Sequence, residues 1–465
     1  MVAATIFAGL ALASAPKSVE ITIYNGNFGL IKEVRAVQLK DGRQELRVED
    51  VPSSIDPTSV GIRSLTNGFP IEMLEQNYQY DLLSPEAILA KSVGKRVRFR
   101  QQLQNGQQVI TEGILMSLGN VVIKTDDGRI ILNPQGSIEV MEIPAGLISK
   151  PTLMWDLVAD KSGPHDLEVA YLTNNIDWSA DYVLTLNADD SKADLNGWVT
   201  INNRCGATWN DAKLKLVAGD VRRIREQLTS GRAGGFGGGG LRAKEAGFEE
   251  QQLFEYHLYT LGRPATVRNN ETKQIALLSA ADVDVHKDLI FEGQKSYWYS
   301  YGRNYRPGEG YATDAGTKVN IVVEVTNSDK NKLGMPLPKG KVRVYKRDSS
   351  GQVQMVGEDQ IDHTPREEKI KLYIGDAFDI VGERKRTEFK IIASNIIRET
   401  FEIKLRNRKK TAETVRVMEH AWSEWTILNE TMKSEKVDSN SFQYVVKLQP
   451  DKEEVIRYTV ETRWP

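Results

Sequence analysis

Hydrophobic and polar residues alternate along much of this chain. In residues 321–326, 401–406 and 456–461 apolar residues stand at every second position, as in Phe401-Glu-Ile403-Lys-Leu405. A period of two with one apolar face is typical of a half-buried antiparallel strand. Such runs recur at short intervals, separated by turn signals such as Asp41-Gly42 and Ser350-Gly351. The pattern predicts an all-β fold of multidomain antiparallel β-sandwiches.

Helical signals are few. Ser84-Pro-Glu86 supplies an N-cap serine, a proline at the first helical position and an acidic residue, which predicts a short helix to Lys91. A second helix is expected from Ala243 to about Tyr256. Both are connectors, because neither belongs to a longer helical pattern.

The elements group into successive regions. Five short strands (97–100, 109–117, 121–124, 130–132 and 138–142) predict a small SH3-like or Sm-like barrel. The expected regions are a signal peptide over 1–15, an N-terminal β unit over 17–83, the small barrel over 94–146, a β-sandwich region over 150–300 and an immunoglobulin-like C-terminal sandwich over 315–465.

Residues 1–15 form an apolar run that ends in small residues. Ala11-Leu-Ala13 and Ala13-Ser-Ala15 both fit a signal-peptidase site, so we expect a secreted or periplasmic protein. The basic stretch that normally precedes such a run is missing. Either the start codon has been assigned too late, or the segment is a hydrophobic N-terminal strand. No segment reaches the ~20 apolar residues that a membrane-spanning helix needs, so we expect no transmembrane segment.

Charge and cysteine content argue against two classes of function for this chain: nucleic-acid binding and catalysis by a cysteine nucleophile. The chain carries 61 basic and 63 acidic residues, so the clustered basic excess that nucleic-acid binding needs is missing. The single Cys205 rules out an intramolecular disulfide and is expected to be a small buried hydrophobe rather than a nucleophile.

Motifs for catalysis are missing too. The glycine-rich loop 231–240 matches G-x-G-x-x-G through Gly235, Gly237 and Gly240. A dinucleotide site would also need a parallel strand before it and a crossover helix after it, which the pattern does not provide. The sequence has no G-x-S-x-G or H-E-x-x-H motif. We therefore predict no catalytic residue and no cofactor.

One candidate metal site stands on a predicted strand. Asp282, Asp284 and His286 alternate with valines and would project from one face, with the oxygen and nitrogen ligands that divalent cations use. Neighbours two apart on a strand are ~7 Å from each other, so one ion could hold about two of them. The alternative is an ordinary solvated sheet face.

A second candidate is a cluster of aromatic residues in a glycine-rich context. Exposed tyrosine and tryptophan side chains stack on sugars and anchor interfaces. The alternative is a strand whose aromatic residues pack on both faces. The predicted binding residues are Tyr297, Trp298, Tyr299, Tyr301, Tyr305 and Tyr311.

The segment Asn203-Arg-Cys-Gly206-Ala-Thr-Trp209 is expected to be a corner between two strands. Gly206 suits a turn with positive φ, Asn203 can bond the turn backbone, and Trp209 would fold onto the sheet.

Several motifs together resemble the bacterial mucoidy inhibitor A-like family, whose C-terminal domain has no known function. They are Trp178…Tyr182, Asn203-Arg-Cys-Gly206…Trp209, Tyr256-His-Leu-Tyr259…Arg263-Pro264 and Gly375-Asp-Ala-Phe-Asp379…Gly382-Glu-Arg-Lys385, with Ile23-Tyr-Asn-Gly26 near the start. The resemblance covers most of the chain and implies a β-rich secreted or periplasmic protein without established catalytic residues. The small barrel stands where longer members carry a coiled coil, so this is a short form.

Three functions remain open. The leading hypothesis is a non-catalytic cell-envelope protein that binds a protein or a glycan. The first alternative is a hydrolase acting on envelope polymers, with its site at a domain junction. The second is a surface protein that forms homo-oligomers through its sheet edges.

Overall fold

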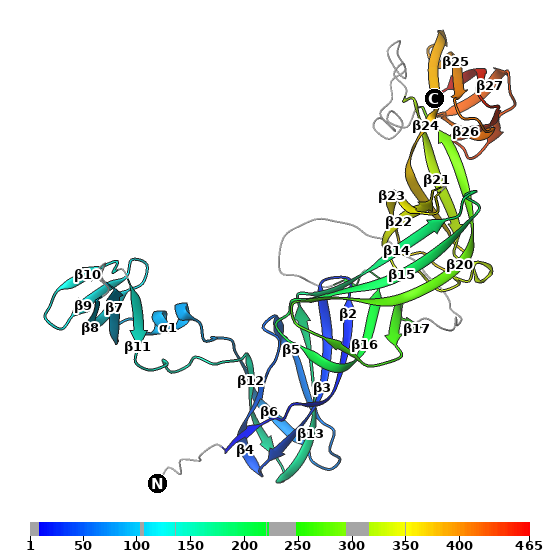
Figure 1. Ribbon diagram of the computed structural model, residues 1–465. Helices are drawn as coiled ribbons and strands as arrows, with labels where there is room; N and C mark the ends of the chain where they lie inside the picture. The colour runs from blue at the N-terminus through cyan, green and yellow to red at the C-terminus, as the bar shows by residue number, and fades with distance from the viewer. Residues whose placement is uncertain are drawn as a thin grey trace. The chain divides into compact units, whose positions relative to one another are not determined.

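The computed structural model describes residues 9–102, 107–134, 136–219, 221–222, 248–293, 316–348 and 350–465. The described chain is nearly all strand, in several sheets whose strands are mostly antiparallel (Figure 1). It contains one α-helix, α1 (Pro85–Lys91), and one 3-10 turn, η2 (Asp329–Asn331). The predicted all-β class is confirmed.

The chain divides into two compact units. Unit 1 comprises residues 1–178, 201–224 and 260–273, and unit 2 comprises residues 179–200, 225–259 and 274–465. Three long strands supply residues to both, namely β14 (Ile176–Leu186), β15 (Lys192–Asn203) and β20 (Glu271–Phe291).

Two of the sheets of unit 1 contain strands along which buried and partly exposed residues alternate. One has the order β1-β4-β12-β6, with bounds Gly9–Leu12, Gly42–Glu49, Thr152–Ala159 and Ile71–Gln79. The other contains the path β16-β2-β3-β13-β5, with bounds Trp209–Ala218, Pro16–Tyr24, Phe28–Leu39, Gly163–Asn174 and Ile55–Ser64, and β19 (Ala265–Val267) pairs with β16.

The N-terminal strand β1 pairs with β4 in parallel register. Residues 1–8 lie outside the described part of the chain, so the signal peptide stays a prediction. None of the helices in the described ranges combines the length and hydropathy needed to cross a bilayer.

The five short strands expected between 94 and 146 are confirmed. They form one sheet in the order β10-β9-β8-β7-β11, with bounds Ile130–Leu132, Val122–Thr125, Gln108–Ser117, Arg96–Gln102 and Ser137–Val140. Val97, Phe99, Leu115 and Ile123 form its buried core. Strands β10 and β11 are the two ends of this sheet, and no barrel closes among the described residues.

One helix prediction is confirmed and the other is wrong. Ser84 caps α1, and its side chain accepts a hydrogen bond from the Ala87 N–H at 3.0 Å. The second predicted helix is instead strand β17 (Phe248–Leu253), followed by strand β18 (Tyr256–Leu261). Phe254 turns between them at a φ of 58°. Pairing between these strands satisfies their backbone groups and overrides the helical propensity of this polar segment.

The predicted corner is confirmed. Asn203 donates from Nδ2 to the Ala207 and Arg268 carbonyls at 2.9 and 3.0 Å and accepts from the Cys205 N–H. Gly206 has a φ of 97°, Cys205 is buried, and Trp209 begins β16 as a buried side chain. The segment closes a turn between two strands.

Unit 2 contains most of a sheet with the order β23-β22-β14-β15-β20-β21-β24-β25-β30-β27. Besides β14, β15 and β20, this sheet contains β23 (Val353–Ile361), β22 (Gly340–Arg347), β21 (Lys318–Thr326), β24 (Lys369–Ala393), β25 (Ile396–Asn407), β30 (Glu453–Arg463) and β27 (Glu424–Glu430), with β26 (Glu413–His420), β28 (Glu435–Lys436) and β29 (Ser441–Leu448) paired off the main path. The C-terminal core packs Phe401 and Tyr458 against Phe442 and Tyr444, with Phe442 edge-on to Tyr458 at 5.4 Å between ring centroids.

Candidate functional site

An open groove of about 550 Å³ lies in unit 2. Strand β20, strand β21, the η2 turn and the residues just before and at the start of β24 line it. We call it the charged groove, and its lining residues are Asp284, Val285, His286, Glu324, Thr326, Ser328, Asp329, Lys330, Asn331, Glu367 and Lys369. Two of the three predicted metal ligands, Asp284 and His286, are among them, and Asp282 is not.

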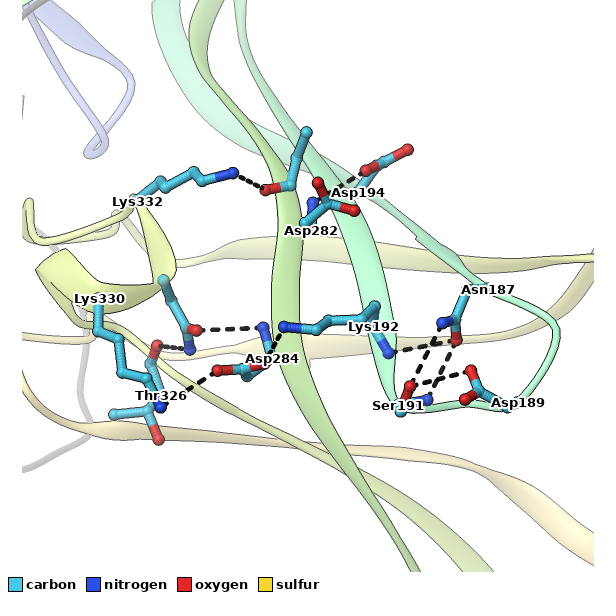
Figure 2. Close-up of polar contacts among 12 residues, drawn as sticks. Asn187, Asp189, Ser191, Lys192, Asp194, Asp282, Asp284, Thr326, Lys330 and Lys332 are labelled. Carbon is cyan, nitrogen blue, oxygen red and sulfur yellow. Dashed lines mark hydrogen bonds and ion pairs between the residues drawn. The ribbon is translucent and has the colours of Figure 1, made fainter.

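The alternation on β20 presents these side chains outward. Val283 is fully buried, whereas Asp282 and His286 are exposed and Asp284 is half-buried. Asp282 adopts a φ of 58°, and its N–H donates to Oδ1 of Asp194 at 3.2 Å (Figure 2). A strand pattern with a simple period of two does not predict this left-handed backbone at Asp282.

Lysines hold the Asp284 carboxylate from two sides. Lys192 donates to Oδ1, and Lys330 Nζ lies 3.3 Å from Oδ2 (Figure 2). The hydrogen bond from Lys192, followed by that from Lys330, lowers the pKa of Asp284 below its ordinary value. Asp284 is therefore an ionised group neutralised by its neighbours.

The two lysines reach Asp284 because local turns place them there. Asn187 Oδ1 accepts from the N–H groups of Ser191 and Lys192 at 3.1 and 3.2 Å, which fixes the β14–β15 turn that ends at Lys192 (Figure 2). On the other side, Asn331 Oδ1 accepts from the Asp284 N–H at 3.1 Å, and its Nδ2 donates to the Thr326 carbonyl at 2.9 Å. The η2 turn is thus fastened to β20 and carries Lys330 with it.

Glu324 has a similar environment on β21. It stands directly opposite His286 in the β20–β21 ladder. Lys369 and Lys371 each lie 3.3 Å from its carboxylate. Partial burial works to raise the pKa of Glu324, but the two lysines outweigh it and leave the pKa below its ordinary value.

His286 extends into solvent. Its side chain is 72% exposed, and Nε2 lies 3.2 Å from Oδ1 of Asp288, a carboxylate that also accepts from Arg416. Asp329 pairs with Arg366 at 2.6 Å. Asp288 and Asp329 therefore each have a cationic or imidazole partner.

The metal-site prediction stays a prediction. No group of three or more His, Cys, Asp or Glu side chains within the described ranges is placed to hold one ion. An ion at Asp284 would have to displace Lys192 and Lys330, and Asp282 is bonded through its backbone rather than directed into the groove.

The other sequence candidates lie elsewhere. The aromatic residues Tyr297, Trp298, Tyr299, Tyr301, Tyr305 and Tyr311, and the glycine tract 231–240, lie outside the described residues. Among the groove residues that sequence reasoning missed are Glu324, Lys330 and Lys369. The segment Asn327-Ser-Asp-Lys330, a polar run after an alternating strand, is the signal that predicts a turn there.

Comparison with known proteins identifies a family. A family model described as "Domain of unknown function (DUF4139)" matches residues 167–465, a range that contains the whole charged groove. No curated protein matches the chain.

Proposed function

The chain belongs to the DUF4139 family, and we propose that it is a binding protein of the bacterial cell envelope whose charged groove takes a protein segment. Two finer assignments belong to this proposal. The chain is a short form of the mucoidy inhibitor A-like proteins, as its motifs suggest, and it is exported. The apolar residues 1–15 and the two small-x-small sites support export.

The lining of the groove is the observation that carries the proposal. Small-molecule and cofactor sites are mostly apolar with a few polar groups. Here four carboxylates and two lysines line one open depression, and Val285 is the one apolar side chain among the lining residues. Such a surface complements a segment with charges of both signs.

Ion-pair exchange would provide specificity. The carboxylates of Asp284 and Glu324 are held by lysines in the free protein. An incoming basic side chain can replace a lysine at a carboxylate, and the released lysine can then pair with an acidic side chain of the ligand. Charge complementarity of this kind favours one partner over others and accelerates association at low salt.

A capture experiment tests this proposal. Mature chain carrying Lys330→Glu and Lys369→Glu should lose its bound protein from an envelope extract, while wild type retains it. The charge-matched control Lys433→Glu with Lys447→Glu changes two exposed lysines outside the groove and should bind as wild type does.

Three results would contradict the proposal. They are equal capture by the groove variant, capture of glycan alone, and association only with further copies of this chain. N-terminal sequencing of the chain from a bacterial periplasmic fraction tests export separately, with cleavage expected after Ala13 or Ala15.

A further inference from the structure

Three polar side chains, none of which lines the charged groove, meet at one end of the C-terminal core. His420 ends strand β26, and Ser441 begins strand β29 directly opposite it in the antiparallel ladder. Glu292 follows strand β20, whose last residue, Phe291, pairs with Val417 of β26. Three strands therefore converge on this point.

The three side chains form a hydrogen-bonded series. His420 Nδ1 lies 3.0 Å from the Ser441 hydroxyl, and His420 Nε2 lies 2.6 Å from Oε1 of Glu292. With the ring proton on Nε2, Glu292 accepts it and Nδ1 is left to accept the serine O–H. The carboxylate thereby fixes the ring orientation and the tautomer.

Serine, histidine and a carboxylate in this order are the parts of a nucleophilic hydrolase, which is recognised by geometry and roles rather than by sequence position. From the arrangement we propose that Ser441, His420 and Glu292 form a site that hydrolyses short-chain acyl esters. Ser441 is 7% exposed, and the side chains of His420 and Glu292 are 9% and 14% exposed. So little access suits a small acyl group rather than a bulky one.

The reaction balances with water as the only co-reactant. Ser441 Oγ bonds to the ester carbonyl carbon while its proton passes to His420 Nδ1. The bond to the alkoxy oxygen then breaks, and the alcohol leaves with that proton. Water repeats the sequence on the acyl-serine, releasing the carboxylic acid and restoring the Ser441 hydroxyl. Glu292 stabilises the imidazolium that forms at each proton transfer.

A fluorophosphonate probe tests the nucleophile directly. The probe should label Ser441 in the full chain, with loss of fluoride, and peptide mass spectrometry should locate the adduct. Ser441→Ala and His420→Asn should abolish labelling, and Glu292→Gln should reduce its rate at least ~10-fold. Ser439→Ala is the matched control and should react as wild type does, because the Ser439 hydroxyl lies outside the hydrogen-bonded series of Ser441, His420 and Glu292.

A cysteine variant separates reactivity from folding. Ser441→Cys keeps the side-chain shape, and its thiol should react with iodoacetamide at neutral pH on the order of tenfold faster with His420 present than with His420→Asn. The natural Cys205 gives little background, because burial raises its pKa to about 11.

Two results would overturn the site: folded wild type that the probe does not label at Ser441, or a Ser441→Cys thiol whose alkylation ignores His420. The inference does not depend on the groove. Lys330→Glu with Lys369→Glu should leave labelling unchanged, so failure of one proposal is distinguishable from failure of the other.

Discussion

At the scale of single residues, Arg384 carries a buried charge in the C-terminal core. Its side chain and that of Glu419 are fully buried, and its Nε lies 3.0 and 2.9 Å from the two carboxylate oxygens. The guanidinium stacks 3.8 Å from the centre of the Phe401 ring, and the Tyr458 hydroxyl also donates to Glu419. Burial works to lower the pKa of Arg384, but Glu419 and Tyr458 keep it above its ordinary value.

Removing the Glu419 charge should destabilise the chain severely. Glu419→Gln keeps the shape but leaves the Arg384 charge buried without its carboxylate, which typically costs ~3–5 kcal/mol. Urea unfolding followed by tryptophan fluorescence measures the loss. Glu424→Gln, at an exposed position of β27, is the control and should change stability by less than ~0.5 kcal/mol. A loss equal to that of the control would mean that the buried pair contributes nothing.

Asp190 gives a prediction about pH. Lys287 and Lys346 each lie 2.5 Å from its carboxylate, and although burial works to raise its pKa, the lysines hold it below the ordinary value. A lowered folded-state pKa contributes stability above the unfolded pKa of ~3.9, and that contribution is lost as pH falls through the folded value.

Asp190→Asn should therefore be less stable than wild type at pH 7, by about 1 kcal/mol for two partly exposed ion pairs. The difference should persist down to about pH 4 and shrink at more acidic pH. Denaturation curves for both proteins across this range provide the measurement. A difference that is constant with pH would show that packing, not charge, is responsible.

At the scale of elements, the alternation of hydrophobic and polar residues predicts which segments are strands, but not which strands and side chains meet in the fold. β21, β25 and β30 were each predictable because one face of the strand is buried, as in Phe401, Ile403 and Leu405. The strand at 248–253 was not predictable from its sequence, because pairing with β18 decides its structure. Likewise Asp284 and His286 were predictable as outward residues, but Lys192 and Lys330 meet Asp284 only through strand register and turn geometry, which a sequence pattern does not encode.

The corner after β15 gives a prediction at this scale. A Cβ at Gly206 would lie 2.1 Å from Ser53 Oγ, and the backbone there has a φ of 97°. Gly206→Ala should therefore cost ~1–3 kcal/mol from strain and displacement of Ser53. Gly61→Ala is the matched control, since nothing lies within 4 Å of its Cβ position and its φ is not positive. Equal melting temperatures for the two variants would contradict this account of the corner.

At the scale of the whole molecule, the chain carries an insertion with adjacent ends. The segment from α1 to β11 has its own buried core. On either side of it, the Leu83 N–H donates to the Ile148 carbonyl at 2.9 Å, and the Ile148 N–H donates to the Asp81 carbonyl at 3.0 Å. The chain therefore leaves and returns at neighbouring points. The family match begins at residue 167, after the insertion.

Excision of residues 84–147 should leave the rest of the chain folded, because a short Gly-Ser linker can join ends that are already hydrogen-bonded neighbours. The one ion pair lost in the described chain across this boundary joins Lys91 and Asp81, both partly exposed, and such pairs contribute little. We expect the melting temperature to change by no more than ~4 °C. Deletion of residues 150–174, which removes β12 and β13 from two sheets, is the control and should unfold unit 1. If excision of 84–147 caused the same collapse, the insertion would be an integral part of unit 1 rather than a module set into it.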